Sequence, residues 1–218
     1  MARKFKKSKV SICVFCEGES EQAYIDFLKS EFHDVAVFKR PSSPGLFDDA
    51  DNRFKKDPGY RNYVDAIDEI WFFFDVEEKD IGNWTNRLEI IKRLRKLRKD
   101  PKIRVRLLMT TGCIEYWLIL HYRHLAPSLL TVPDKERMLA QVVNMEPTYR
   151  KGNYDATARI AQNYPTAVKN ATIVLQNLLQ EGMPGLEDTD ERNRWLCTKC
   201  KTFSTVQEAI VFLEGLQS

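Results

Sequence analysis

The run Ile-Trp-Phe-Phe-Phe at residues 70–74 limits the possible folds more than any other feature of the chain. Consecutive side chains of a β-strand point to opposite faces of its sheet, so large apolar residues in a row require burial on both faces. This is typical of a central strand in a parallel sheet that helices cover on both sides. Shorter apolar runs predict three further strands, at 10–16, 35–38 and 103–109.

Helical patterns separate these strands along the chain. Residues 41–60 and 182–203 carry no sustained apolar period and are predicted to be loops. The alternation of strand and helix predicts a doubly wound, Rossmann-like α/β domain over residues 1–125. Residues 126–218 are predicted to form a helical extension that packs on this domain. Helices are expected at 20–32, 63–67, 84–99, 114–124, 134–145, 154–162, 165–181 and 204–216.

Composition excludes several classes of protein. Of the 218 residues, 43% are hydrophobic and 30% are charged, which is enough for a large core and excludes a disordered chain. No apolar run approaches the roughly 18–20 residues that cross a membrane. The five cysteines stand at irregular spacing, which argues against the disulfide framework of a secreted protein and favours reduced thiols. We therefore expect a cytoplasmic protein that does not enter a membrane.

The formal net charge of +3 hides an uneven distribution. Residues 87–106 carry ten Lys and Arg against two acidic residues, and residues 1–10 carry five against none. Such stretches attract a polyanion, although basic runs also form ordinary solvated surfaces. Nucleic acid is the expected partner, held through its sugar–phosphate backbone without reading of the bases. The candidate contacts are Lys92, Arg93, Arg95, Lys96, Arg98, Lys99, Arg104 and, in a separate basic and aromatic segment, Lys151.

Acidic side chains follow two of the predicted strands. Glu17 comes directly after the first strand, and Asp75, Glu77 and Glu78 follow the Ile-Trp-Phe-Phe-Phe strand. Because the carboxyl ends of parallel strands meet at one edge of a sheet, we expect these carboxylates to lie close together. Oxygen ligands of this kind suit Mg²⁺ or Mn²⁺, which bind through a few carboxylates plus phosphate and water. The alternative is that they are solvated acids at the ends of strands.

Four other residues are candidates for supporting roles. Gly18 permits a tight turn and a close approach of phosphate after the first strand. Glu21 stands at the start of the next helix, where an acid also complements the helix dipole. Glu115 lies in the first turn of the 114–124 helix, just after a strand, and is able to approach the acidic edge. His121 lies on the apolar part of the same helix, where a hydrogen-bonded core position is the alternative to a catalytic base.

Short segments of the chain are similar to those of a known family. They are Cys-Glu-Gly-Glu-Ser-Glu at 16–21, Phe-Asp-Val-Glu-Glu at 74–78, Glu-Tyr-Trp-Leu-Ile-Leu-His-Tyr at 115–122 and, less specifically, the closing segment 203–210. Together they resemble the RloB-like family, whose members are linked with restriction and abortive phage-infection loci and contain a Toprim-like domain. The resemblance touches most of the chain, and its first three motifs are the specific ones.

The resemblance implies a Toprim core of the kind shared by topoisomerases, primases and overcoming-lysogenization nucleases. In such cores a glutamate after the first strand and an Asp-x-Asp after a later strand bind Mg²⁺ for phosphoryl transfer. Glu17 matches that glutamate and Asp75 matches the first aspartate, whereas Glu77 stands in the place of the second aspartate. Glutamate keeps the charge but reaches one methylene farther, and Glu78 is the substitute ligand if Glu77 does not serve.

These residues and the resemblance predict a Mg²⁺- or Mn²⁺-dependent nuclease that hydrolyses DNA or RNA in phage defence, with Glu17, Asp75 and Glu77 as catalytic residues. The alternative is a non-catalytic subunit with a degenerate acidic site, which binds nucleic acid or a partner protein. Glu77 is the feature that favours this second interpretation. The chain has no Gly-x-x-x-x-Gly-Lys-Ser/Thr phosphate loop, so an ATPase is expected only as a separate partner protein. The sequence leaves the strand type and the oligomeric state open.

Overall fold

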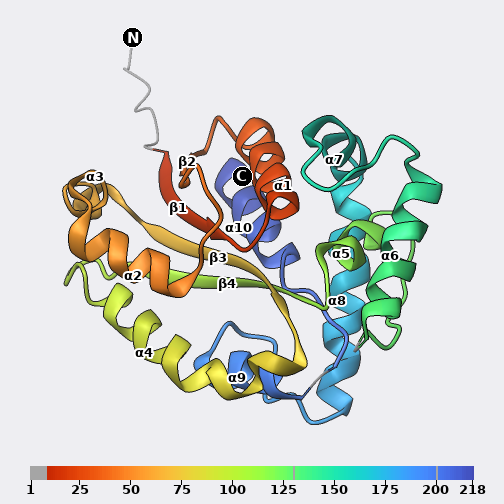
Figure 1. Ribbon diagram of the computed structural model, residues 1–218. Coiled ribbons are helices and arrows are strands. Elements are labelled where there is room, and N and C mark those ends of the chain that lie inside the picture. Colours follow the sequence, from red (N-terminus) through yellow and green to blue (C-terminus); the bar gives the residue numbers. More distant parts are fainter. Residues whose placement is uncertain (1–8, 130, 200) are drawn as a thin grey trace.

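A four-stranded parallel sheet forms the centre of the molecule (Figure 1). The computed structural model describes residues 9–129, 131–199 and 201–218. The strand predicted from the Ile-Trp-Phe-Phe-Phe run is central and buried along almost its whole length, and the predicted α/β class with a parallel sheet flanked by helices is confirmed. The strands, in their order across the sheet, are β2 (Ala36–Lys39), β1 (Val10–Cys16), β3 (Glu69–Val76) and β4 (Arg104–Thr111).

Helices cover both faces of the sheet, and each face has its own hydrophobic core. The first core joins the sheet to α1, α5 and α10, with α6 and α7 contributing, and the second joins it to α2, α3, α4 and α9. Helix α8 supplies side chains to both. Among the described helices, none is both long and apolar enough to cross a membrane. The helices are α1 (Glu19–Glu31), α2 (Phe47–Lys56), α3 (Pro58–Arg61), α4 (Trp84–Arg95), α5 (Ile114–Leu120), α6 (Val132–Met145), α7 (Tyr154–Ala161), α8 (Tyr164–Gln180), α9 (Asp190–Thr198) and α10 (Gln207–Gln217), with short 3-10 helices η1 (Val64–Ala66) and η2 (Glu78–Asn83).

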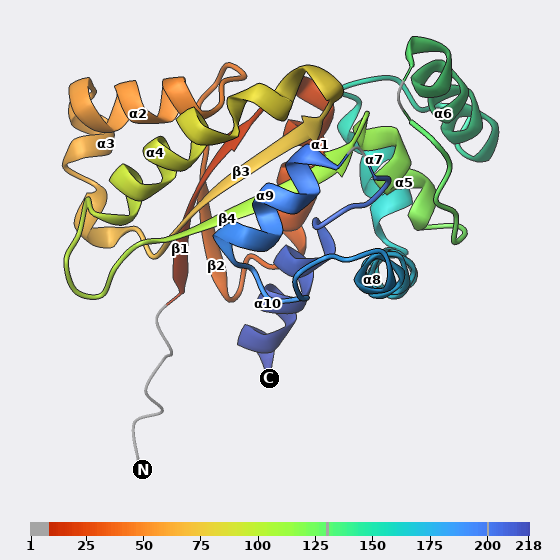
Figure 2. The ribbon, with the colours of Figure 1, turned by 90° about the horizontal axis from the view of Figure 1, so that it is seen from below.

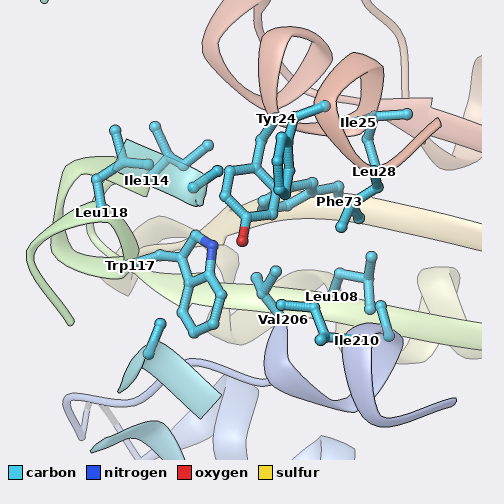
Figure 3. Packing of buried hydrophobic residues seen from close by; sticks show 14 of the residues in the cluster. Tyr24, Ile25, Leu28, Phe73, Leu108, Ile114, Trp117, Leu118, Val206 and Ile210 are labelled. Atoms are coloured by element: carbon cyan, nitrogen blue, oxygen red, sulfur yellow. The ribbon is translucent and has the colours of Figure 1, made fainter. Parts of the chain in front are cut away.

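Aromatic side chains of β3 fill both cores. Phe73 points into the first core, where Tyr24 meets it edge-on at a centroid distance of 6.1 Å and Trp117 packs close by (Figure 3). Phe72 points the other way and stacks on Phe47 at 4.2 Å. Each such pair adds about 0.5–1.5 kcal/mol beyond the burial of its apolar surface. The strand therefore needs large apolar residues at consecutive positions, as its sequence shows.

Two segments that were predicted to be loops contain helices. Residues 41–60 hold α2 and α3, and residues 182–203 hold α9, so both loop predictions are wrong. In α2, the buried residues Phe47, Ala50 and Phe54 recur at helical spacing and pack on the sheet. The charged residues between them weaken this pattern in the sequence, so only the packing reveals it.

Helices α4 and α5 are shorter than the sequence predicts. Helix α4 ends at Arg95 instead of residue 99, and α5 ends at Leu120 instead of residue 124. Beyond α4, the guanidinium of Arg98 donates to the backbone carbonyls of Asp65 and Pro101. These bonds stabilise a turn that replaces the last helical turn.

The C-terminal segment is joined directly to the sheet. Ser204 forms an antiparallel bridge with Thr110 of β4. The neighbouring helices α9 and α10 pack on opposite faces of the sheet, as Figure 1 shows. The division into domains at 1–125 and 126–218 stays a prediction, and helices of the second range contribute to both cores.

Candidate metal centre

The carboxyl ends of β1 and β3 lie side by side at one edge of the sheet, which we call the acidic edge. Cys16 ends β1 in register with Phe73 of β3, and the backbone N–H of Glu17 donates to the Phe73 carbonyl at 3.0 Å. The chain runs from β1 to β2 on one side and then returns to β3 on the other. Ligands of open α/β sheets bind where the strand order reverses in this way. Figure 2 shows both arrowheads at this edge.

Asp75, the last residue but one of β3, carries a buried oxygen that lacks a hydrogen-bond partner. Its Oδ1 atom makes no hydrogen bond to the described residues. Burial raises the pKa of Asp75 well above its ordinary value, the carboxylates of Glu21, Glu17 and Glu115 raise it further, and Lys135 lowers it. A buried carboxyl oxygen without a donor is costly unless a proton or a cation satisfies it. This position therefore favours the binding of positive charge.

Glu17 approaches Asp75 from the turn between β1 and α1, and Glu21 approaches it from the first turn of α1. The Oε2 atom of Glu17 accepts a hydrogen bond from the backbone N–H of Asp75 at 3.0 Å. Glu21 is buried in the first turn of α1, and this burial, with the charges of Glu17 and Glu115, raises its pKa to about 7. Gly18 leaves room for the Glu21 carboxylate, because a Cβ atom at position 18 would lie 2.8 Å from Glu21 Oε2.

Glu115 completes the carboxylate group, by which we mean Glu17, Glu21, Asp75 and Glu115. It lies in the first turn of α5 and is only 1% exposed. The Tyr149 hydroxyl donates to Glu115 Oε1 at 3.2 Å. Tyr149 lies between α6 and α7, so the predicted helical extension reaches the acidic edge. Tyr149 was not predicted to belong to the site, and its place in a basic and aromatic segment was the only signal in the sequence.

Glu77 and Glu78 follow β3 at its carboxyl end. Glu77 forms an ion pair with Lys135 in the first turn of α6. Glu78 begins η2 and is exposed. Their roles as metal ligands stay predictions. Lys135 was missed by the sequence analysis because a lysine on a surface helix carries no local signal of an acidic neighbour.

The structure places His121 in the hydrophobic core at the far end of α5. Its Nε2 atom lies 3.1 Å from the Tyr24 hydroxyl, and its Nδ1 atom lies 3.0 Å from the Trp117 carbonyl oxygen. Burial lowers the pKa of His121 to about 4, so the ring is neutral at physiological pH. Burial causes this shift, and the hydrogen bonds of the ring to the backbone of Trp117 and Leu118 oppose it. A core position therefore fits the geometry of His121.

The basic residues of α4 and the following turn lie away from the acidic edge. Helix α4 starts beyond the carboxyl end of β3 and runs back along the sheet toward the opposite edge (Figure 1). Two of its arginines form ion pairs with neighbouring helices on the same face of the sheet. Arg93 pairs with Asp51 of α2, and Arg95 pairs with Asp190 of α9. The structure therefore does not bring Lys92, Arg93, Arg95, Lys96, Arg98, Lys99 or Arg104 together with the carboxylate group, whereas Lys151 lies 3.9 Å from Glu115.

The carboxylate group fits a hard divalent cation by its chemistry. Within residues 9–129, 131–199 and 201–218, no three Asp, Glu, His or Cys side chains stand close enough to form a finished metal site. The buried Oδ1 atom of Asp75 nevertheless has no partner, and three further carboxylates raise its pKa. Oxygen ligands and an excess of negative charge are what Mg²⁺ and Mn²⁺ require.

The profile of the family described as RloB-like protein matches residues 12–210. The chain belongs to the RloB-like family. The matched range includes the whole carboxylate group as well as Lys135, Tyr149 and Lys151. No curated protein matches the chain.

We expect Glu21→Gln to stabilise this RloB-like protein at pH 8 and to leave its stability unchanged near pH 4.5. The folded-state pKa of about 7 exceeds the ordinary value of 4.5, so protonation favours the folded state below that range. As the pH rises through 7, the folded protein must ionise a buried carboxyl, and this stability is lost. The expected gain at pH 8 is about 2 kcal/mol. Urea denaturation in EDTA at several pH values measures it, and equal stabilisation at all pH values would contradict the raised pKa.

Proposed function

We propose that this RloB-like protein is a divalent-cation-dependent nuclease that hydrolyses phosphodiester bonds of DNA or RNA. The single observation that carries the proposal is the buried Oδ1 atom of Asp75, which has no hydrogen-bond partner among the described residues and lies among three other carboxylates. Its position at the switch point of a parallel sheet supports the same conclusion. Membership of the RloB-like family suggests a role in restriction or phage defence, and we propose that the protein acts in the cytoplasm.

Asp75, Glu17 and Glu21 are the residues that would hold Mg²⁺ or Mn²⁺. The ion, when bound, would neutralise charge on the scissile phosphate and lower the pKa of a water molecule. Without the cation, burial and the neighbouring carboxylates raise the pKa of Glu21 to about 7, so Glu21 would give up its proton as the cation binds, and binding is expected to strengthen from pH 6 to pH 8. Glu115 is held in place by the Tyr149 hydroxyl and keeps the site negative.

A cleavage assay tests this proposal. The purified chain is incubated with plasmid, linear duplex DNA, single-stranded DNA, messenger-like RNA and tRNA, each with Mg²⁺, Mn²⁺ or EDTA. We expect cleavage of at least one substrate class that requires the cation and rises from pH 6 to pH 8, as Glu21 loses its proton. Cation binding by calorimetry is measured on the same sample. Absence of both binding and cleavage, with nucleic acid present, would overturn the proposal.

A second candidate is a non-catalytic subunit that binds nucleic acid or a partner protein. The ion pair between Glu77 and Lys135 favours it, because Glu77 stands where the family pattern has an aspartate ligand. In this case an ATPase would be a separate partner, and the basic turn after α4 would dock nucleic acid away from the acidic edge. Nucleic-acid binding that is unaffected by Mg²⁺ and never followed by cleavage would support this candidate.

A further inference from the structure

We propose that Lys135 and Lys151 are the residues that bind the phosphates of the substrate strand at the acidic edge. This inference rests on the proposed function. In the structure both ammonium groups serve as counter-ions of site carboxylates, Lys135 for Glu77 and Lys151 for Glu115. A divalent cation that binds the carboxylate group takes over this role and releases the lysines toward a phosphodiester.

Lys135 is held toward the end of β3 by the start of α6. Thr131 and Asp134 form a capping box there, in which the Thr131 side chain accepts from the Asp134 N–H and the Asp134 carboxylate accepts from the Thr131 N–H. This fixes the first helical turn, which carries Lys135. The side chain of Lys135 is half-buried against Glu77, and its charge also lowers the pKa of Asp75. Lys135 is thus close to both Glu77 and Asp75.

Lys151 reaches the same edge from the loop between α6 and α7. The next residue, Gly152, has a left-handed φ of +75° and donates its N–H to the Ser20 hydroxyl at 3.3 Å. A Cβ atom at position 152 would lie 3.1 Å from Glu19, so glycine allows the loop to approach the start of α1 closely. The Lys151 side chain itself is 65% exposed, and its Nζ atom is 3.9 Å from the buried Glu115 Oε1. Its backbone is fixed, whereas its ammonium group is free to turn to a ligand.

The positive charge that a cation adds to the acidic edge would make both lysines leave their carboxylates for a phosphate. A divalent cation among Glu17, Glu21 and Asp75 repels both ammonium groups and reduces the negative potential that holds them. Lysine is a compact charge on a flexible stem, so it can move to a new anion at small cost. The two lysines come from different segments and approach different carboxylates, Glu77 after β3 and Glu115 at the start of α5. A phosphodiester bound to the cation would therefore lie within the reach of both.

The test compares Lys135→Met and Lys151→Met with the matched control Lys56→Met. Methionine keeps an unbranched apolar stem without the charge, and Lys56 is an exposed lysine in the last turn of α2. Calorimetry measures Ca²⁺ and Mg²⁺ affinity. Fluorescence anisotropy measures the affinity for a labelled single-stranded 20-nucleotide oligomer, with Ca²⁺ in place of Mg²⁺ to slow cleavage.

Each site variant is expected to change the two affinities in opposite directions. Cation affinity rises a few-fold, because an internal competitor is removed, and oligonucleotide affinity falls roughly tenfold with a smaller dependence on salt, by about 0.7 in the logarithmic slope. Lys56→Met changes neither affinity. Lys135→Arg keeps the positive charge and is expected to retain most oligonucleotide affinity, which separates loss of charge from loss of folding.

Two results would overturn this inference. If wild type binds the cation and the oligonucleotide but both methionine variants match Lys56→Met, the lysines are structural counter-ions only, and the proposed nuclease stands without them. If the methionine variants lose cation affinity, the lysines support the metal site instead of competing with it. A wild-type protein that binds no cation overturns the proposed function itself, and this inference with it.

Discussion

Asp75→Asn is expected to weaken divalent-cation binding at least ~100-fold and to reduce any phosphodiester cleavage by roughly 10³-fold or more. Asparagine keeps the shape of the side chain but loses the negative charge, so the buried position no longer attracts a cation. The Oδ1 atom of Asp75 has no hydrogen-bond partner in the described chain, so the substitution breaks no hydrogen bond of that atom. Removing one of four neighbouring carboxylates also relieves repulsion, and we expect unchanged or increased thermal stability at pH 8.

Calorimetry with Mg²⁺ and Mn²⁺, thermal denaturation at pH 8 and the cleavage assay together check this prediction. The matched control is Asp65→Asn, which removes an exposed carboxylate of η1 at the opposite edge of the sheet. The control is expected to bind the cation as wild type does. Equal cation affinity in Asp75→Asn and wild type would move the metal centre away from the acidic edge. A large loss of stability would instead show that Asp75 has a structural role.

Glu69→Ala is expected to destabilise the fold by about 3–5 kcal/mol, because it leaves a buried guanidinium without its partner. Arg106 of β4 donates to both carboxylate oxygens of Glu69 in β3, at 3.0 and 3.1 Å, and the Trp71 indole N–H donates to the same carboxylate at 2.6 Å. Glu69 is 5% exposed and Arg106 is 4% exposed. Water cannot replace these bonds without opening the sheet.

Urea denaturation of Glu69→Ala, compared with the double variant Glu69→Leu/Arg106→Met, measures this effect. A buried ion pair that is replaced by apolar residues of similar size is often neutral, so the double variant is expected to recover most of the lost stability. A loss below about 1 kcal/mol in Glu69→Ala would show that the pair is hydrated. The carboxylate group lies at the other edge of the sheet, so the folded single variant is expected to keep its affinity for divalent cations.

The strands, and the burial of β3 on both of its faces, were predictable because the sequence signal for them is local. Five consecutive apolar residues in the 70–74 run cannot all be buried unless both faces of a strand are covered, and β3 is buried on both faces. Helix α2 was missed for the converse reason. Its few buried residues, Phe47, Ala50 and Phe54, are separated by charged ones, and only contact with the sheet distinguishes them from a polar loop.

The acidic edge was predicted in part. Glu17 and Asp75 follow directly from the strand ends, because parallel strands that are neighbours end at the same edge. Glu21 and Glu115 were named as supporting residues, and the structure shows them as the carboxylates that, with Glu17, raise the pKa of Asp75. Lys135 was not predictable, because its partner lies 58 residues away in the sequence and no local pattern marks the contact.

The sequence by itself determined the class of fold and the chemistry at the strand ends, because burial on alternate faces and a residue's place after a strand are local properties. Only the tertiary structure decided which charges meet. In the fold, the basic helix α4 runs away from the carboxylate group, and its residues Arg93 and Arg95 form ion pairs with Asp51 and Asp190. It brought Tyr149 and Lys151 to Glu115, and Lys135 to Glu77, from segments far along the chain. The physical reason is that the strength of a charge interaction depends on distance and burial in the folded protein, neither of which a linear sequence specifies.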